Sequence, residues 1–287
     1  MVKAIFAWIG LTVLTVSGAF GQLQDNREKQ LNCEDRDLDL WAGKCEMREQ
    51  TLASVGQLTL DVGRRGSVSV KGWTRSDVLV RARVEAWGGS DSDASLALSQ
   101  IHVDSAAGRI AATGPGFSNN SYWSVSYEIF APQTHDLKIT AVNGGISVWD
   151  VTGRMDLGTR NGPLELKRVA GDVTGKTRNG PVRLTVAGNN WQGRHLDLET
   201  RNGGVAISVP TNFQARIQAE SVNGGIQSDL GGAVEGSRPR KLDVTLAVAV
   251  PAQVQRINVI LVPENSPSAG ATLKVATRNG GISLAQI

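Results

Sequence analysis

The sequence has few of the residues that metal sites and catalytic centres need. It contains three histidines, His102, His135 and His195, and two cysteines among 287 residues. No histidine stands at metal-ligand spacing from another histidine or from a cysteine, so the sequence predicts no metal site and no cofactor. It also lacks a Gly-x-Ser-x-Gly elbow, a phosphate-binding Gly-rich loop and a His-Glu metalloprotease motif. These absences favour a protein that is not an enzyme.

Charge of one sign is not concentrated anywhere in the chain. The 30 basic and 27 acidic residues are mixed along the sequence and give a formal net charge of +3. Nucleic-acid binding needs a basic face with aromatic platforms, or a known motif, and the sequence has neither. We therefore expect no nucleic-acid partner.

Long apolar runs are absent except at the N-terminus. An apolar stretch from Ala4 to Val16 follows a lysine and is followed by small residues. This layout is typical of a secretory signal peptide, here residues 1–21, with Ala19 and Gly21 at the small positions before the cut. The stretch is shorter than the roughly 20 residues of a spanning helix. We expect an exported chain in the periplasm, at the cell surface or secreted, with no transmembrane segment after cleavage.

Residues 22–55 are dense in charge and predict a loop-rich leader. Its two cysteines, Cys33 and Cys45, enter an oxidising compartment on export, so we expect them to form a disulfide. Two thiols alone cannot complete a tetrahedral metal shell, which argues against a metal site here.

Period-two alternation of apolar and polar residues begins after the leader. Leu58 to Val62 and Val78 to Ala86 alternate in this way, which predicts half-buried strands. Gly- and Ser-rich stretches separate the strands and mark turns. The sequence therefore predicts an all-β domain over residues 56–287 that opens with antiparallel strands.

A repeat follows these strands. Asn-Gly pairs recur at Asn143, Asn161, Asn179, Asn202, Asn223 and Asn279. The first five are separated by 18, 18, 23 and 21 residues, and four of the six lie in the tetrapeptide Thr-Arg-Asn-Gly. Each pair is followed by an apolar-polar-apolar triplet. Asn-Gly is also the strongest hairpin signal, but a simple meander does not require the same four residues at the same phase.

We therefore predict a β-solenoid with coils of about 18–22 residues, in which identical residues stack as ladders. Asn and Gly suit such a corner, since both tolerate positive φ and the Asn amide can bond along a ladder. The repeat coils are expected over residues 139–230, with a capping insertion at 231–270 and a final coil at 271–287. Within the insertion, two apolar strands are expected at Leu242 to Val250 and Ile257 to Val262.

With these motifs the chain resembles the bacterial putative-adhesin family, a domain of unknown function built from repeated Asn-Gly rungs. The resemblance covers roughly Gln57 to Leu284 and rests on the first strands, the rungs from Asn143 to Asn223 and the rung at Asn279. It implies an exported β-solenoid without established catalytic residues.

The recurrent arginines Arg160, Arg178 and Arg201 are the leading candidate site. If the coils stack in register, their guanidinium groups form a column that binds phosphate or carboxylate on an extended anionic polymer. In the alternative that the residue pattern favours, each arginine bonds a carboxylate such as Glu199 or packs its stem over the corner. Trp191 is a candidate for stacking on a glycan, although packing in the core is the favoured role.

The sequence leaves three functions open. The favoured one is a non-catalytic adhesin-like or scaffold protein that binds an anionic polysaccharide or an envelope protein. The second is a polysaccharide-active β-helix enzyme, and the third is a structural module that associates end to end. The carboxylates available to an enzyme are Asp156, Glu165, Asp172, Asp197 and Glu199. Their phases in the repeat are expected to differ, which scatters them instead of pairing them for glycoside hydrolysis.

Overall fold

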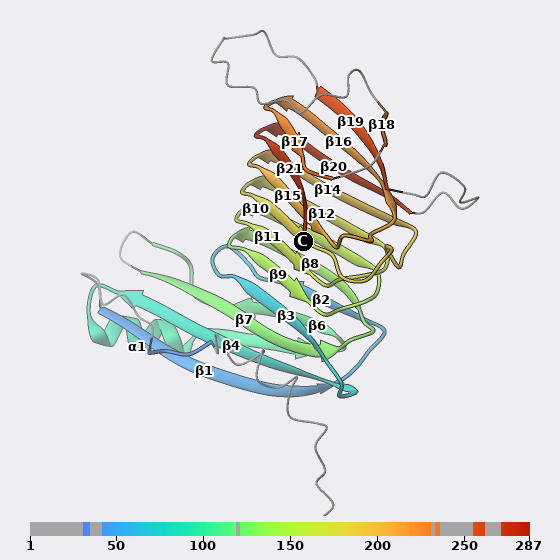
Figure 1. Cartoon of the computed structure of the whole chain (residues 1–287). Helices are drawn as coiled ribbons and strands as arrows, with labels where there is room; N and C mark the ends of the chain where they lie inside the picture. Colours follow the sequence, from blue (N-terminus) through green and yellow to red (C-terminus); the bar gives the residue numbers. More distant parts are fainter. Residues whose placement is uncertain (1–30, 35–41, 119–120, 231–232, 236–254, 262–270) are drawn as a thin grey trace, which may run out of the picture. The chain divides into compact units, whose positions relative to one another are not determined.

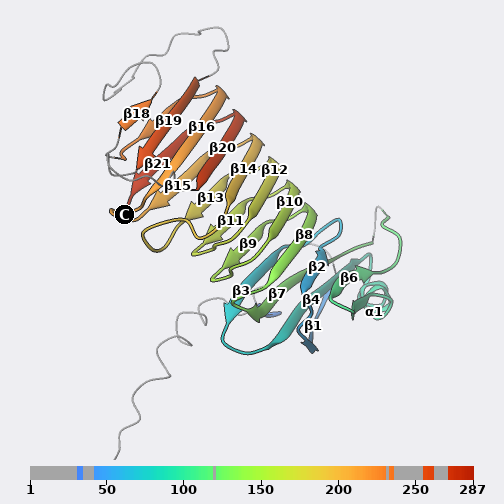
Figure 2. The same cartoon turned by 90° about the vertical axis from the view of Figure 1, so that its right-hand side faces the viewer.

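The computed structural model describes residues 31–34, 42–118, 121–230, 233–235, 255–261 and 271–287. The predicted signal peptide, residues 22–30 and 35–41 of the leader and the strand expected at Leu242 to Val250 lie outside these residues. The described chain is all-β, with two large mixed sheets and one helix, α1 (Asp91–Ser99) (Figures 1 and 2). The all-β class predicted from the sequence is thus confirmed.

One sheet has ten strands, and most of them are parallel. In spatial order they are β1 (Ala42–Ala53), β4 (Asp77–Gly88), β7 (Tyr122–Pro132), β3 (Val68–Trp73), β9 (Ile146–Trp149), β11 (Leu164–Lys167), β13 (Val182–Thr185), β15 (Val205–Val209), β21 (Ile282–Gln286) and β17 (Ile226–Ser228). Only the β1–β4 and β4–β7 pairs are antiparallel.

The other sheet has eleven strands. In spatial order they are β18 (Ala233–Glu235), β19 (Gln255–Leu261), β16 (Ala215–Asn223), β20 (Thr272–Asn279), β14 (His195–Asn202), β12 (Val173–Asn179), β10 (Met155–Asn161), β8 (Asp136–Asn143), β2 (Gln57–Asp61), β6 (Arg109–Thr113) and β5 (His102–Ala106). From β16 to β6, each strand is parallel to the next one in this order.

The repeated segment alternates between the two sheets. From β8 to β15 each even-numbered strand lies in the eleven-stranded sheet and the next strand lies in the ten-stranded sheet. Equivalent residues of successive repeats are direct partners, so that Asn143, Asn161, Asn179 and Asn202 are paired in register. The 18-residue period therefore corresponds to one strand in each sheet joined by an Asn-Gly corner.

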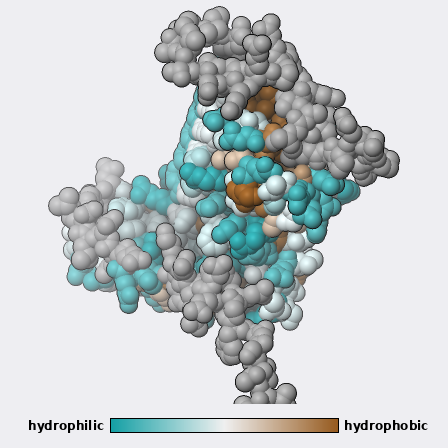
Figure 3. All heavy atoms as spheres, in the orientation of Figure 1, coloured by the Kyte–Doolittle hydropathy of each residue, from teal (hydrophilic) through white to brown (hydrophobic). Residues whose placement is uncertain are grey.

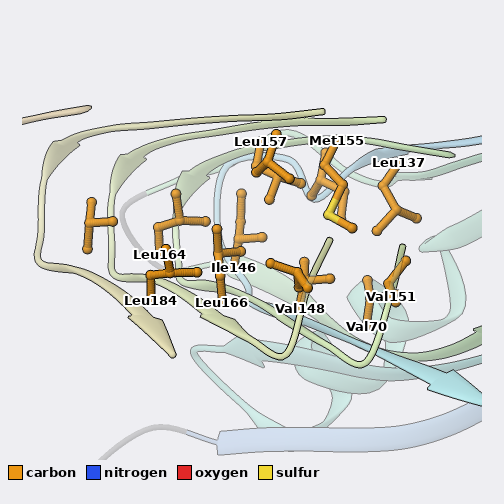
Figure 4. Close-up of a cluster of buried hydrophobic side chains, with 14 of the residues drawn as sticks. Val70, Leu137, Ile146, Val148, Val151, Met155, Leu157, Leu164, Leu166 and Leu184 are labelled. Carbon is orange, nitrogen blue, oxygen red and sulfur yellow. The ribbon is translucent and has the colours of Figure 1, made fainter. Parts of the chain in front are cut away.

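The core lies between the inner faces of the two sheets. The alternating apolar residues point inward and are buried, as Ile146 and Val148 of β9 and Leu164 and Leu166 of β11 illustrate (Figure 4). Met155 and Leu157 of β10 face them from the other sheet. Because the side-chain period of a strand is two, the intervening residues are left on the outer faces of the sheets.

Two predictions for the first strands are wrong in part. The leader was expected to be loop-rich, but Ala42–Ala53 forms β1, which is paired along its length with β4. β2 and β3 are not antiparallel: they pair in parallel with β8 and β9, so the stack begins near Gln57. Their corner reads Gly-Arg-Arg-Gly and lacks the Asn-Gly signature. The expected Cys33–Cys45 disulfide is present and ties residue 33 to β1.

The final repeat does not close the stack. β20 lies between β14 and β16, and β21 lies between β15 and β17. The edge of β16 is instead covered by β19, which runs antiparallel to it and belongs to the expected capping insertion. The order of repeats in space therefore differs from their order in the sequence.

Candidate binding site

Each Thr-Arg-Asn-Gly corner contains a buried threonine whose hydroxyl bonds the neighbouring coil. The four threonines of this tetrapeptide, and a serine in the fifth equivalent position, point inward and are buried. Each hydroxyl donates a hydrogen bond of 2.8–3.0 Å to a glycine carbonyl of the neighbouring coil: Thr159 to Gly144, Thr177 to Gly162, Thr200 to Gly180, Thr277 to Gly203 and Ser221 to Gly280. The residue after each of them must point outward, and after the four threonines that residue is an arginine.

An asparagine ladder fixes the corners in register. The side-chain amide of Asn161 donates to the Oδ1 of Asn143 at 2.7 Å, and the same bond joins every later pair in the order Asn179, Asn202, Asn279 and Asn223. Asn143 continues the ladder by donating to the carbonyl of Arg64. Each rung is therefore tied to the next by side chain as well as by backbone.

The glycines of the corners allow the coils to approach closely. A Cβ on Gly162 would lie 2.2 Å from the carbonyl oxygen of Gly144, and one on Gly180 would lie 2.1 Å from that of Gly162. Asparagine tolerates positive φ, but among the described residues only Ala107, Asp150 and Arg168 have a positive φ without being glycine. Asparagine is needed at these corners for its amide.

The arginine column consists of Arg160, Arg178, Arg201 and Arg278. All four side chains are exposed on the outer face of the eleven-stranded sheet. Each lies between a Thr and an Asn that are paired in register with those of the next strand, so neighbouring arginines are one strand, about 4.8 Å, apart. Three members were predicted from the sequence. Arg278 was missed because the insertion of β20 beside β14 was not foreseen.

The arginine column carries an uncompensated charge. Within the described parts of the chain, none of its four guanidinium groups has a carboxylate within ion-pair distance or a hydrogen-bond acceptor. Glu199, the expected partner, binds Lys176 at 3.3 Å instead. Among the described residues, the expected pairing of these arginines with a carboxylate such as Glu199 is not found.

The column ends where valine replaces arginine. In the first and last of the Asn-Gly rungs in space, the residue before the asparagine is Val142 and Val222. The surrounding rows of the sheet are mixed in sign, since Lys176 lies beside Glu199, and Glu220 binds Arg256, which lowers the pKa of Glu220. The arginine column, in which every charge is positive, is thus limited to the four consecutive strands β10, β12, β14 and β20.

The carboxylates proposed for an enzyme are divided between the two sheets and one corner, with Asp156, Asp197 and Glu199 on the eleven-stranded sheet. Asp156 and Asp197 occupy the same position on β10 and β14, with Thr174 of β12 between them, so the expectation that all phases differ is wrong for this pair. Two strand spacings put their backbones about 9.6 Å apart, near the upper limit for inverting glycosidases. Glu165 lies in the other sheet.

Asp172 is held by an arginine outside the arginine column. Arg194 donates a hydrogen bond of 2.8 Å to it from Nε and another from its backbone N–H. These bonds lower the pKa of Asp172 to about 2. An aspartate that stays ionised in this way is a structural partner and a poor proton donor.

Trp191 is part of the core. It is 5% exposed, and its indole N–H donates to the carbonyl of Gly171 at 3.0 Å. Its ring is buried, so the glycan-stacking role considered for it has no exposed ring face to use.

A buried ion cluster was not foreseen from the sequence. Lys71 lies 2.8 Å from Glu128, and both side chains are almost fully buried on the outer side of the ten-stranded sheet. Arg81 binds the second oxygen of Glu128 at 2.9 Å and also reaches Glu49 of β1. The cluster joins β1, β4, β7 and β3, so it stabilises the antiparallel end of the sheet. No sequence motif marks it, because its members come from four strands.

The coloured part of the molecular face in Figure 3 is largely polar. On the face seen in Figure 3, hydrophilic residues surround smaller hydrophobic patches. The exposed large hydrophobic residues of the described chain, Val55, Leu96, Val142 and Ile287, are far apart in sequence. Among the described residues there is no group of three or more potential metal ligands, and no helix is long and apolar enough to cross a membrane.

The fold and the site define an all-β protein with two mixed sheets and a cationic column across one of them. No family model matches the chain, and neither does any curated protein. Among solved structures it is similar to a putative cell adhesion protein from Clostridium sporogenes, with 15% identity over 84% of this chain and 100% of that one and a TM-score of 0.43. A putative adhesin from Bacteroides fragilis shares 9% identity over 84% of this chain and 97% of that one, with a TM-score of 0.38. A putative lipid binding protein from Parabacteroides distasonis shares 10% identity over 85% and 96%, with a TM-score of 0.28.

Proposed function

We propose that the protein is an exported, non-catalytic adhesin-like or scaffold protein that binds an anionic polymer of the cell envelope or its surroundings. In this proposal the stacked coils are a β-solenoid, and the arginine column is the binding site. The observation that carries it is the row of four exposed guanidinium groups without carboxylate partners in the described chain. The disulfide supports export, because such bonds persist in oxidising compartments.

The geometry of the arginine column suits a polymer better than a single ion. Arginine binds carboxylate and phosphate through two parallel N–H donors, and the repeat places such a fork on each of four neighbouring strands. A chain with regularly spaced negative groups that lies across the strands contacts all four. Each further arginine contact then adds to the affinity without a further entropic cost for ordering the protein.

Binding to charged and neutral polysaccharides tests the proposal. Wild-type protein is incubated with immobilised polygalacturonate and with dextran, and bound protein is measured. Replacing Arg160, Arg178 and Arg201 with Gln should weaken polygalacturonate binding by more than about tenfold, since a hydrogen bond to a charged group contributes roughly 1.5–3 kcal/mol. The matched control replaces three exposed lysines on the same face, Lys138, Lys176 and Lys274, with Gln and makes the same change in net charge.

Only the arginine variant should lose binding. Equal losses in both variants would show that net charge, not the column, attracts the polymer, and unchanged binding in the arginine variant would exclude the site. The same samples are assayed for new reducing sugar ends. Release of ends that disappears in Asp156→Asn/Asp197→Asn would favour the polysaccharide-active enzyme, for which the shared register of these two residues is the supporting observation.

A further inference from the structure

The repeat built from the last residues of the chain fills a place between two earlier repeats. From one coil to the next, the chain normally advances by one strand in each sheet: β8, β10, β12 and β14 are consecutive neighbours, as are β9, β11, β13 and β15. The following step is twice as long. β16 and β17 are separated from β14 and β15 by β20 and β21, so the chain passes over one place in both sheets.

The step over this place is made by the connection Pro210–Gln214. It stacks on the connection between β13 and β14, since the N–H of Gln214 donates to the carbonyl of Asn189 at 2.7 Å. β16 then begins at Ala215. In the eleven-stranded sheet it lies one strand further from β14 than a regular repeat would. The chain thereby forms the walls of a slot whose filling, residues 272–287, comes only after β18 and β19.

The side chains and carbonyls that recur in every repeat bind the inserted segment on both walls of the slot. Asn279 donates to Asn202 on one side and accepts from Asn223 on the other, each at 2.7 Å. Thr277 donates to the carbonyl of Gly203, and Ser221 donates to that of Gly280. Backbone bonds join the segment to β14 and β15 on one side and to β16 and β17 on the other. None of these contacts depends on which chain the segment belongs to.

The order of synthesis leaves the slot without its filling for part of folding. Until residues 272–287 are available, the facing edges of β14 and β16 expose unpaired backbone groups or pair with each other in the register of Asn202 and Asn223. Either state has to give way to the inserted segment. A segment of the same sequence from another chain meets the same edges, and exchange of identical elements is a known route to linked copies.

We propose that the slot between β14–β15 and β16–β17 accepts residues 272–287 of a second copy of this chain, so that exchange of the last repeat links protein copies. The partner is thus another molecule of the same sequence. In the linked form, Arg278 of one copy completes the arginine column of the other. The proposal rests on strand order and does not depend on what the arginine column binds.

The test uses full-length chains with their native disulfide intact. Ala206 and Ser283 are paired across β15 and β21, and both are exposed. One copy carries Ala206→Cys and another carries Ser283→Cys. The two are unfolded in urea, mixed, refolded at increasing concentration and treated with a short bismaleimide. A covalent dimer is then measured on a denaturing gel.

Two controls define the outcomes. A single chain with both cysteines should cross-link internally, which shows that the pair is reachable, and a mixture of Ser147→Cys with Ser283→Cys reports chance collisions, because β9 and β21 are not neighbours. Exchange should give a dimer yield several-fold above the Ser147 mixture, rising with concentration during refolding. A yield equal to that mixture at every concentration, with internal cross-linking intact, would overturn the proposal.

Discussion

Neutralising one member of the arginine column should stabilise the protein. Arg178 lies between Arg160 and Arg201, each about one strand spacing of 4.8 Å away. In water two unit charges at that distance repel by about 0.9 kcal/mol, and 0.15 M salt, with a Debye length of about 8 Å, reduces this to roughly 0.5 kcal/mol. Arg178→Gln removes two such interactions, so the free energy of unfolding should rise by up to about 1 kcal/mol at 0.15 M salt.

The gain in stability should depend on how many arginine neighbours the replaced residue has, which a change in packing would not explain. Arg160 has an arginine on one side and Val142 on the other, so Arg160→Gln should stabilise by about half as much as Arg178→Gln. The gain should grow as salt is lowered. Urea unfolding followed by tryptophan fluorescence measures it, because urea leaves the ionic strength unchanged. Lys176→Gln is the control, since it removes a positive charge that is paired with Glu199 and should give no gain.

A loss of stability in Arg178→Gln at low salt would refute this reasoning. It would show that the arginine stem packs over the corner and stabilises the coil by more than the charge repulsion costs. A gain in stability combined with weaker polymer binding would instead match the trade-off expected of a functional site.

Three further predictions concern the scaffold. Gly162→Ala should destabilise by about 1–3 kcal/mol in urea unfolding, because its Cβ would lie 2.2 Å from a carbonyl of the next coil, whereas Gly158→Ala on the preceding strand β10 meets nothing within 4 Å and should be tolerated. Trp191→Ala should cost about 3–5 kcal/mol, since the buried indole fills the core; a change below 1 kcal/mol would contradict that role. The pKa of Asp172 is lowered to about 2, so its contribution to stability is complete above the ordinary value of 3.8 and is lost as pH falls through about 2. The difference in urea midpoint between wild type and Asp172→Asn should therefore shrink over that range, and a constant difference would exclude the assignment.

The sequence was a good guide wherever the repeat was regular. The 18-residue spacing predicted the strands and the alignment of Asn143, Asn161 and Asn179, because identical corners stack only in register. It did not predict the parallel pairing of β2 and β3, since their corner reads Gly-Arg-Arg-Gly and lacks the asparagine amide. Nor did it predict β1, whose partners along β4 are recognised mainly through the backbone.

The sequence could not predict which strands lie beside the last repeat, and the reason is physical. Every coil presents the same Asn, Thr and Gly groups to its neighbours, so local sequence cannot state which coil lies beside which. The order is decided by the step from β15 to β16, which leaves one place open. The place of Arg278 in the arginine column could therefore be seen only in the structure. Trp191 was uncertain for a similar reason, because its hydrogen-bond partner Gly171 is twenty positions away in the chain.

The strongest argument that the arginines serve binding comes from the coils that lack them. In the tetrapeptide Thr-Arg-Asn-Gly, the threonine donates to the next coil, the asparagine forms the ladder and the glycine allows close approach, so three of the four residues have structural roles. The corners at Asn143 and Asn223 carry valine in place of arginine and still join the ladder. The corner therefore does not need arginine. A residue that repels its neighbours and is dispensable for the turn, yet recurs on four consecutive strands, supports the proposal that a ligand neutralises it.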